Sequence, residues 1–594
     1  MMKNSNKYLA ALLGILLGAF LIGKIAFVWY NSDIETVSVG TFIKIWANGL
    51  VLDLRTAALM LLVPALCTLL RPPFSIRWVL VPYFCILGFV FAVVTMADIV
   101  MYEFWEFKLC AVHLSYAASP EGTTNSVSMG FLLSRALAVV ALMLLVTISA
   151  IKLTPKHFEG KRQLRMPLFF ILMAVLPIHV GSCYQQGSLF QCHAATNPVF
   201  RFAASFGDAK SYLRYDGAAD EVLAAYKTSN EVTDTLLNTQ RPNVLFVQLE
   251  SFGSQFVEEL GGIPDVTPNL SRLIPEGIFW DQYYSSSFRT DRGTVCAYSG
   301  WIPYPTISPM KETSIHDQLS SLPRSFFDAG YQTGFMYAGA MTNMGKYQYL
   351  AHLGFEALLD ESYFTKEELN SSWGANDGTA AMKMFKTIAE VDTTRHWMMV
   401  WQTLSSHEPW DVPYHRLEDE KLNAFAYTDQ CLGDLIDSLK TLPVWDNLLV
   451  IVIPDHGFLY EQTYDTSDFF HSPMLWLGGA IKEPRQMAVL MNQSDIAATL
   501  LAQMGLPHDN YPWSRNVLAP DYKPFVYCNY PAGLFYKDAT GETLYDLTAN
   551  QPIPLGEPAD STRLSKALNI LRESYSTVTK AKRTFGATET KIKV

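Results

Sequence analysis

The sequence is poor in charged residues and in cysteine for a chain of its length. Only 17% of the 594 residues are Asp, Glu, Lys or Arg, whereas 49% are hydrophobic. The eight cysteines are too few for a disulfide scaffold in a chain of this size. The net charge of -11 lacks the basic excess of a nucleic-acid-binding protein, so we expect no nucleic-acid partner. Scarce charge and abundant apolar residues together indicate membrane segments.

The apolar excess lies in the N-terminal part of the chain and forms five long runs. These runs cover residues 8–30, 49–70, 78–100, 131–151 and 166–180. A membrane-spanning helix needs roughly 20 apolar residues, which the first four runs supply and the last approaches only with the residues after it. The first run also resembles a signal peptide, but no small-residue cleavage site closes it. We therefore expect a domain of five transmembrane helices over residues 1–181.

Basic residues are distributed unevenly around these runs. The segment between the fourth and fifth runs is the most basic, with Lys152, Lys156, Lys161, Arg162 and Arg165. The loops expected on the opposite side hold only Lys44 and Lys108. The positive-inside rule then places the N-terminus in the cytoplasm. With an odd number of spans, we expect a multi-pass protein of the cytoplasmic membrane whose soluble part lies outside the cytoplasm.

Two ionisable residues, Asp53 and Arg55, interrupt the second apolar run. A charge within a span is a candidate functional group and could face a lipid headgroup. The alternative is an interfacial ion pair that sets the end of the helix. The sequence leaves both interpretations open.

After the apolar runs the pattern changes twice. Residues 182–240 are polar and mixed, which predicts a linker of short amphipathic helices near the membrane surface. From residue 241, four runs are apolar on both faces, as strands of a buried parallel sheet are; they read NVLFVQLES, QTGFMYAG, WMMVWQTLSSH and NLLVIVIPDHG. Helix-like stretches lie between them, so residues 241–550 predict an α/β domain with helices on both faces of the sheet. Residues 551–594 predict a helical or disordered tail.

Metal-ligand side chains follow three of these predicted strands. In α/β folds, ligands bind outside the carboxyl ends of the strands. Glu250 follows the first run, His407 the third, and Asp455 with His456 the fourth. Each residue alone is as readily an ordinary loop or turn residue. Two carboxylates and one imidazole together suit Mn²⁺, Zn²⁺ or Mg²⁺.

A hydroxyl-rich segment, SSSFRTDRGTVCAYSG, supplies the nucleophile that this set lacks. Thr290 within it is either a helix cap or a nucleophile, because a divalent ion lowers the pKa of a bound hydroxyl. Beside Glu250, Asp455 and His456, we favour Thr290 as the nucleophile. Thr294, one helical turn further on, is then an ordinary residue.

The motifs PNVLFVQLESF, SSSFRTDRG, SSHEPW and IPDHG occur in this order behind the five apolar runs. In this the chain resembles the lipoteichoic acid synthase branch of the alkaline phosphatase and sulfatase superfamily. The resemblance implies a sulfatase-like domain with a mainly parallel sheet sandwiched by helices. It also implies phosphoglycerol transfer from a phospholipid to an exported acceptor through a phospho-threonine intermediate. An arylsulfatase is excluded, because the hydroxyl-rich segment has no C/S-x-P-x-R motif.

The resemblance assigns roles to individual residues. It implies that one divalent ion, usually Mn²⁺ in this branch, is held by Glu250, Thr290, Asp455 and His456. Thr290 would be the catalytic nucleophile and His407 an active-site histidine near the substrate phosphate. Further phosphate contacts would come from Arg289, Lys346 and His471.

The substrate stays open at the sequence level. The glycerol-phosphate polymerases of this branch bind the headgroup with a tryptophan and an arginine, where this chain has Met344 and Lys346. A lysine binds phosphate as a point charge without the arginine fork. A phosphoethanolamine transferase acting on lipid or glycan is therefore an alternative, and a catalytically silent, lipid-binding membrane regulator is another. The expected partners are a phospholipid donor such as phosphatidylglycerol, an exported lipid or glycan acceptor, and the membrane.

Overall fold

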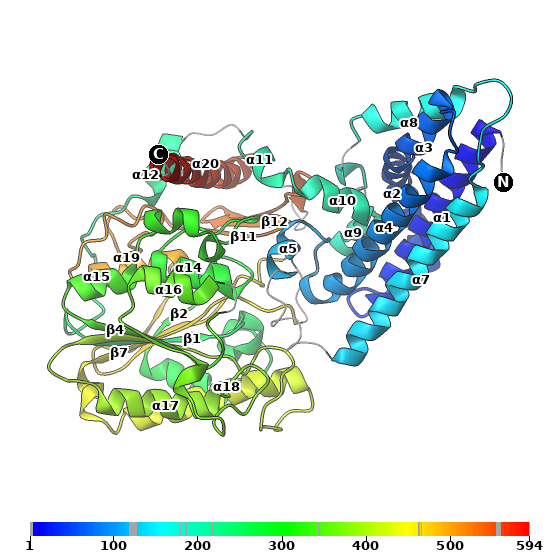
Figure 1. Cartoon of the computed structure of the whole chain (residues 1–594). Helices are drawn as coiled ribbons and strands as arrows, with labels where there is room; N and C mark the ends of the chain where they lie inside the picture. Colours follow the sequence, from blue (N-terminus) through cyan, green and yellow to red (C-terminus); the bar gives the residue numbers. More distant parts are fainter. Residues whose placement is uncertain are drawn as a thin grey trace. The chain divides into compact units, whose positions relative to one another are not determined.

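The structure, a computed structural model of the whole chain, forms two compact units (Figure 1). It describes all residues except 1–3, 118–127, 179, 184–186, 216–218, 343–344, 461–463, 465, 554–559 and 593–594. One unit consists of Met1–Ser115, Val127–Asp208 and Asp546–Gln551. The other consists of Tyr116–Ser126, Ala209–Tyr545 and Pro552–Val594.

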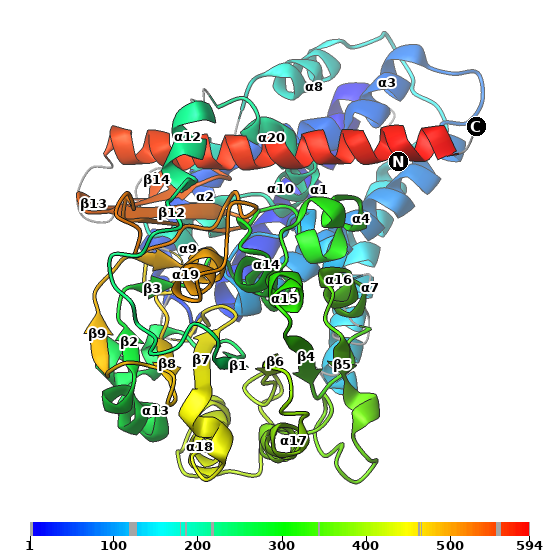
Figure 2. The same cartoon turned by 90° about the vertical axis from the view of Figure 1, so that its left-hand side faces the viewer.

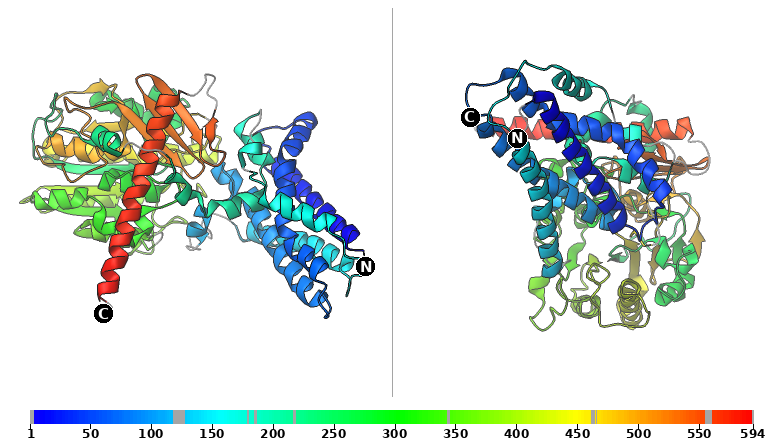
Figure 3. Two further views of the ribbon diagram at one scale, coloured as in Figure 1. Left: turned by 90° about the horizontal axis from the view of Figure 1, so that it is seen from above. Right: turned by 90° about the vertical axis from the view of Figure 1, so that its right-hand side faces the viewer.

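The first unit is helical, and three of its helices are long and apolar enough to cross a membrane. They are α1 (Ser5–Tyr30), α4 (Arg77–Trp105) and α7 (Met129–Leu153), which run side by side (Figure 3). A fourth crossing is possible if α2 (Val39–Met60) and α3 (Leu62–Leu70), bent by 47° at their junction, form one span. In the described part of the chain, the fifth predicted span appears only as the short helix α8 (Arg165–Val175). Its 11 residues make about 16 Å of helix, less than a hydrocarbon core of about 30 Å, so five complete spans are not confirmed.

Asp53 on α2 lies inside this helical unit, where its side chain is nearly inaccessible. Its Oδ1 is 3.4 Å from Nζ of Lys24 on α1 and accepts a 2.8 Å hydrogen bond from Nδ2 of Asn197. Asn197 lies between α9 (Leu189–Ala195) and α10 (Pro198–Ser205). Of the two interpretations of Asp53, the structure shows an ion pair, but one that is buried between helices.

A second buried pair, Asp98 on α4 with Lys108, lies near the first. Both pairs line a cavity of about 20 Å³, which is room for a single water molecule. Each of the two carboxylates pairs with one ammonium group, so the two buried pairs together carry no net charge.

The second unit contains an eight-stranded sheet in the order β5-β4-β6-β1-β7-β8-β2-β9. The strands are β1 (Asn243–Leu249), β2 (Ile278–Trp280), β4 (Gln332–Tyr337), β5 (Ala357–Leu359), β6 (Trp397–Gln402), β7 (Leu448–Pro454), β8 (Met474–Leu477) and β9 (Arg485–Met487). Every pairing is parallel except those of β8 with its two neighbours. The four predicted strands are β4, β6, β1 and β7, which are consecutive in the sheet.

Helices cover both faces of this sheet (Figures 1 and 2). On one side lie α17 (Asp377–Glu390) and α18 (Glu420–Leu439), and on the other α14 (Thr290–Ser299), α15 (Leu322–Asp328), α16 (Lys346–Leu353) and α19 (Ile496–Gln503). Side chains of β1 alternate between the faces: Leu245 packs in the core with Phe425 of α18, and Phe246 contacts Tyr298 of α14 edge to face. The predicted α/β architecture with a mainly parallel, sandwiched sheet is confirmed.

A second, smaller sheet was not predicted. It contains β11 (Phe525–Tyr530), β12 (Gly533–Asp538), β13 (Gly541–Asp546) and β14 (Gln551–Ile553). Helix α20 (Ser561–Ile592) runs along it, as Figure 2 shows. The predicted tail is therefore largely helical, whereas the preceding strands were missed.

Candidate functional site

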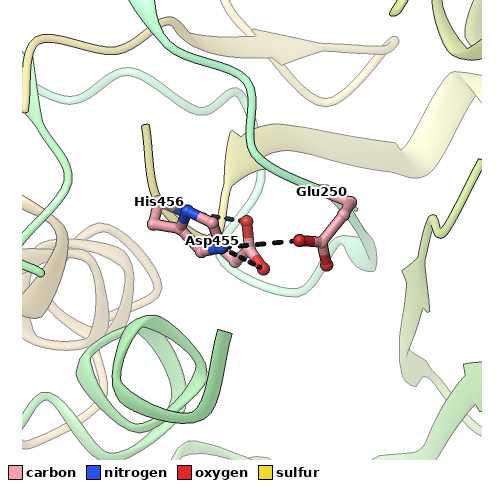
Figure 4. Close-up of side chains that lie close together, drawn as sticks. All are labelled: Glu250, Asp455 and His456. Atoms are coloured by element: carbon pink, nitrogen blue, oxygen red, sulfur yellow. Dashed lines mark hydrogen bonds and ion pairs between the residues drawn. The ribbon is translucent and has the colours of Figure 1, made fainter. Parts of the chain in front are cut away.

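Three potential metal ligands meet at the carboxyl ends of the central strands (Figure 4). In the β1–β7 pairing Leu249 lies opposite Pro454, so Glu250 and Asp455 follow paired residues. One ligand atom each of Glu250, Asp455 and His456 lies within 4.8 Å of the others, and all three side chains are buried. The sequence pattern predicted this grouping, and the register of the sheet explains it.

The backbone after β1 fixes the orientation of Asp455. Ser251 adopts a left-handed conformation with φ 64°, and its N–H donates to Oδ1 of Asp455 at 2.8 Å. The N–H of His456 donates to the same oxygen, also at 2.8 Å. Oδ2 of Asp455 is buried and has no hydrogen-bond partner among the described residues. An orphaned carboxylate oxygen of this kind is well suited to a cation.

His456 presents Nε2 to the two carboxylates. Its Nδ1 is 2.6 Å from the carbonyl oxygen of Gly457, so Nδ1 carries the proton and donates it there. Nε2 lies 3.4 Å from Oε1 of Glu250 and 3.7 Å from Oδ2 of Asp455. An imidazole whose Nδ1–H is bound to a carbonyl is the usual form of a histidine ligand. The donor set therefore fits one divalent cation.

The pKa values of the three groups reflect crowded charges. Burial alone would raise the pKa of Glu250, but the hydrogen bond and charge of His456 outweigh it and hold this pKa well below its usual range. Burial and the nearby charge of Glu250 raise the pKa of Asp455 to about 7. Burial opposes protonation of His456, but the two carboxylates outweigh it and raise its pKa. Two buried carboxylates in one site thus raise each other's cost of ionisation, and both are stabilised by the same positive charge on His456.

Thr290 is the first residue of α14, and its side chain reaches this group. Its Oγ1 lies 3.3 Å from Oε2 and 3.4 Å from Oε1 of Glu250 and donates a hydrogen bond to that carboxylate. Thr290 thus lies at the N-terminus of a ten-residue helix, the end of a helix that favours a phosphate group. Arg289, directly before the helix, is in extended conformation at the N-cap. Thr294 is fully buried and accepts a hydrogen bond from Nε2 of Gln248, as an ordinary core residue would.

Gly293 allows α14 to approach the end of β7. A Cβ at this position would lie 1.9 Å from the carbonyl oxygen of Asp455. Only glycine therefore allows this separation between α14 and the end of β7. Gly293 was not among the predicted site residues, although a glycine within a helical stretch is a signal of close packing.

Buried charges directly after Thr290 hold the first turn of α14. Oδ1 of Asp291 is 3.2 Å from Nη1 of Arg292, and its Oδ2 is 3.4 Å from Nζ of Lys311. Burial would raise the pKa of Asp291, but Arg292 and then Lys311 outweigh it, so this pKa is about 2. This network fixes the start of the helix that carries Thr290, and the sequence analysis did not identify it.

Lys346 is the first residue of α16 and lies beyond the end of β4. Its Nζ donates to Oε1 of Gln402 at 3.0 Å and lies 3.6 Å from the ring centroid of Tyr337. Burial lowers its pKa to about 8, opposed by the charges of Glu250 and Asp455. A phosphate role for Lys346 remains a prediction, and Met344 lies outside the described residues.

The two remaining histidines differ in position. His407 keeps 27% of its side chain exposed. It follows β6, which pairs with β1, so its backbone lies at the same edge of the sheet as Glu250. His471 donates from Nε2 to the carbonyl oxygen of Asp281 at 2.8 Å and stacks on Tyr284. The structure does not bring His471 into the group formed by Glu250, Asp455 and His456.

Residues 242–506 match the model of the Sulfatase family. Phosphoglycerol transferase I of Xanthomonas campestris pv. campestris is 24% identical over 315 residues, covering 48% of this chain and 44% of that protein. The lipoteichoic acid synthase-like protein YvgJ of Bacillus subtilis is 22% identical over 354 residues, covering 52% of this chain and 57% of that protein. The chain thus spans about half the length of these relatives. The resemblance expected from the motifs is confirmed.

A solved membrane protein has a similar fold. The lipooligosaccharide phosphoethanolamine transferase EptA from Neisseria meningitidis superposes with a TM-score of 0.54 at 15% identity, covering 86% of this chain and 98% of that chain. This likeness is one of fold. Together with the apolar N-terminal helices, it supports a membrane protein.

We expect Asp455→Asn to weaken the binding of Mn²⁺ at least about tenfold, because the change removes a charged ligand from a buried site. Isothermal titration of the purified full chain with MnCl₂ measures this change. Asp437→Asn is the matched control, since Asp437 is exposed and pairs only with surface basic groups. Equal affinities of the Asp455→Asn variant and the parent chain would contradict the site.

We expect Gly293→Ala to destabilise the catalytic unit by about 1–3 kcal/mol, because the new methyl group overlaps the backbone of Asp455. The midpoint of thermal unfolding in detergent and the affinity for Mn²⁺ should both fall. Gly334→Ala is the control, since its nearest neighbours would be 3.8 Å away. Equal effects of the two substitutions would show that the approach of α14 to β7 tolerates a side chain.

Proposed function

Because residues 242–506 match the model of the Sulfatase family, we propose that the chain is a metal-dependent phosphoglycerol transferase. It would move glycerol phosphate from phosphatidylglycerol to an exported lipid or glycan through a phospho-threonine intermediate. The observation that carries the proposal is the position of the Thr290 hydroxyl, 3.3 Å from Glu250 in a buried set of metal ligands. The names of the two curated relatives support the reaction class.

Glu250, Asp455 and His456, with Thr290, would hold one divalent ion, for which Mn²⁺ is our first choice and Zn²⁺ or Mg²⁺ the alternatives. Bound there, the ion would act as a Lewis acid that lowers the pKa of the threonine hydroxyl. The hydrogen bond to Glu250 orients the Thr290 oxygen. Arg289, Lys346 and the backbone N–H groups at the start of α14 would balance the charge on the phosphate oxygens.

In the first step, Thr290 gives its hydroxyl proton to solvent water and its oxygen attacks the phosphorus of the donor. The bond from phosphorus to the diacylglycerol oxygen breaks, and His407 gives that oxygen a proton. In the second step, the acceptor hydroxyl gives its proton to His407 while its oxygen attacks the phospho-threonine. Thr290 then leaves and takes a proton back from water.

The alternative headgroup, phosphoethanolamine, shares this chemistry. The specific observation in its favour is Lys346, which lacks the arginine fork expected for glycerol phosphate. A catalytically silent regulator is less well supported, because the nucleophile and all three proposed ligands are present and adjacent.

We further propose that the protein is multi-pass and that the catalytic unit lies outside the cytoplasm. The N-terminus would be cytoplasmic, as the distribution of basic residues predicts. The bent pair of α2 and α3 would form the second span, and α8 with the residues after it a short fifth crossing. Such a crossing requires local thinning of the bilayer, at a modest cost in free energy.

We expect Thr290→Ala to abolish release of diacylglycerol from phosphatidylglycerol by the purified full chain with Mn²⁺, because the substitution removes the attacking oxygen. The parent chain should gain the mass of glycerol phosphate on the peptide that contains Thr290, as mass spectrometry would detect. Thr294→Ala is the control. Undiminished turnover by the Thr290→Ala variant would refute the mechanism, and reaction with phosphatidylethanolamine alone would establish the other headgroup.

We expect a membrane-impermeant maleimide to label Lys523→Cys in intact cells and to leave Lys156→Cys unlabelled until the membrane is opened. Both side chains are exposed, Lys523 in the catalytic unit and Lys156 after α7. Labelling relative to the parent chain, read on a gel, measures the difference. The reverse pattern would place the catalytic unit in the cytoplasm.

A further inference from the structure

Two loops at the carboxyl edge of the sheet hold His407 between them. One follows β6 and carries His407 and Glu408, and the other precedes α17 and carries Trp373. We propose that Glu408 and Trp373 are positioning residues that fix His407 with its proton on Nδ1 and present Nε2 to the oxygen of the leaving group. This inference rests on the proposed function and adds two residues to the same site.

The first support is the environment of Nδ1 of His407. This nitrogen lies 3.1 Å from the carbonyl oxygen of Glu408 and 3.3 Å from its Oε2. Both neighbours are acceptors, so Nδ1 must carry a proton in either protonation state of the ring. Nε2 then carries the exchangeable proton, and within the described part of the chain no hydrogen bond to it is found. The His407 side chain as a whole is 27% exposed.

The second support is Trp373, which holds both the ring and the carbonyl group. Its indole Nε1 donates to the carbonyl oxygen of Glu408 at 2.5 Å, the same oxygen that faces Nδ1 of His407. The two rings lie 4.5 Å apart between centroids, inclined at 59°. Trp373 therefore limits rotation of the imidazole and fixes the acceptor of its proton.

The loop that carries Trp373 is itself fixed to the sheet. Gly374 forms a bridge with Gly339, just after β4, and the N–H of Ala375 donates to the carbonyl oxygen of Ala338 at 3.0 Å. At Gly374, φ is 140° and a Cβ would lie 2.0 Å from that same oxygen, so this position requires glycine. The residues directly after Trp373 are therefore fixed to the backbone that follows β4.

Asp377 ties the two loops together at the start of α17. Its carboxylate accepts hydrogen bonds from the N–H groups of Leu404 and Ser405, at 2.9 and 3.2 Å, and its own N–H donates to the hydroxyl of Ser405 at 2.8 Å. Asp377 is fully buried. The distance between Trp373 and His407 is therefore set by buried hydrogen bonds.

The carboxylate of Glu408 also suits the proton transfers required of His407. Because the carbonyl oxygen and the carboxylate of Glu408 hold Nδ1–H, the proton that His407 exchanges with the diacylglycerol oxygen is the one on Nε2. When the bond from phosphorus to the diacylglycerol oxygen breaks, the proton moves from Nε2 of His407 to that oxygen and the ring becomes neutral. The proton of the acceptor hydroxyl then restores the charged ring as the acceptor oxygen bonds to phosphorus.

The test compares two leaving groups, with the purified full chain in detergent and Mn²⁺. Phosphatidylglycerol or phosphatidylethanolamine releases an alkoxide that needs a proton, whereas bis-p-nitrophenyl phosphate releases p-nitrophenolate, which does not. We expect Glu408→Gln to reduce the single-turnover rate of diacylglycerol release by about 10- to 100-fold and that of p-nitrophenolate release far less, because only the first step differs between the two substrates. Trp373→Phe, which keeps a ring but loses the N–H, should lower the ratio of the lipid rate to the aryl-ester rate by a smaller factor. Glu418→Gln, an exposed glutamate nearby, should leave the ratio unchanged.

The protonated nitrogen is read directly by ¹⁵N NMR of histidine-labelled full chain, with the His407 signals assigned from their loss in His407→Asn. We expect neutral His407 to carry its proton on Nδ1 in the parent chain and to populate both forms in Glu408→Gln. A proton on Nε2 in the parent chain, or equal losses on both substrates, would overturn the proposal. Turnover of either substrate by Thr290→Ala would instead overturn the proposed function.

Discussion

The site depends on the close approach of α14 to the end of β7, which Gly293 permits. The parallel pairing of β1 with β7 aligns Glu250 and Asp455, but it does not by itself provide a nucleophile. Helix α14 must come within contact distance of the backbone of Asp455 before Thr290 reaches Glu250. The buried charges of Asp291 and Arg292 then fix the first turn, so the hydroxyl and the helix N-terminus face the same point.

Buried charge is treated differently in the two units. In the helical unit, Lys24 faces Asp53 and Lys108 faces Asp98, so each carboxylate has an ammonium partner. In the catalytic unit, Oδ2 of Asp455 has no hydrogen-bond partner in the described structure, and two carboxylates share one imidazole. Satisfied pairs stabilise a packed arrangement, whereas an unsatisfied anionic set is a binding site. The same residue types therefore have different roles.

The sequence predicts those features that depend on local periodicity and strand ends. The apolar runs that became β4, β6, β1 and β7 are buried on both faces, so their ends located Glu250, Asp455 and His456. Gly293 and Trp373 act through contacts with residues far away in the sequence. A glycine within a helical stretch signals close packing but not its partner, and no local pattern marks Trp373. The small sheet was missed because only two residues separate β11 from β12 and β12 from β13, so the alternation of strand and helix that marked the large sheet is absent there. The fifth predicted span is not confirmed as a complete helix, because the apolar composition continues beyond the end of α8.

The residues proposed to carry out the reaction act on atoms that both candidate lipids share, so these residues do not select one headgroup over the other. Thr290 and the ligands act on phosphorus, and His407 acts on the leaving oxygen, all of which phosphatidylglycerol and phosphatidylethanolamine share. Lys346 is already engaged by Gln402 and Tyr337, so it offers the phosphate a fixed point charge and no shape-specific fork. Discrimination between a glyceryl and an ethanolammonium group must therefore come from side chains beyond the phosphate.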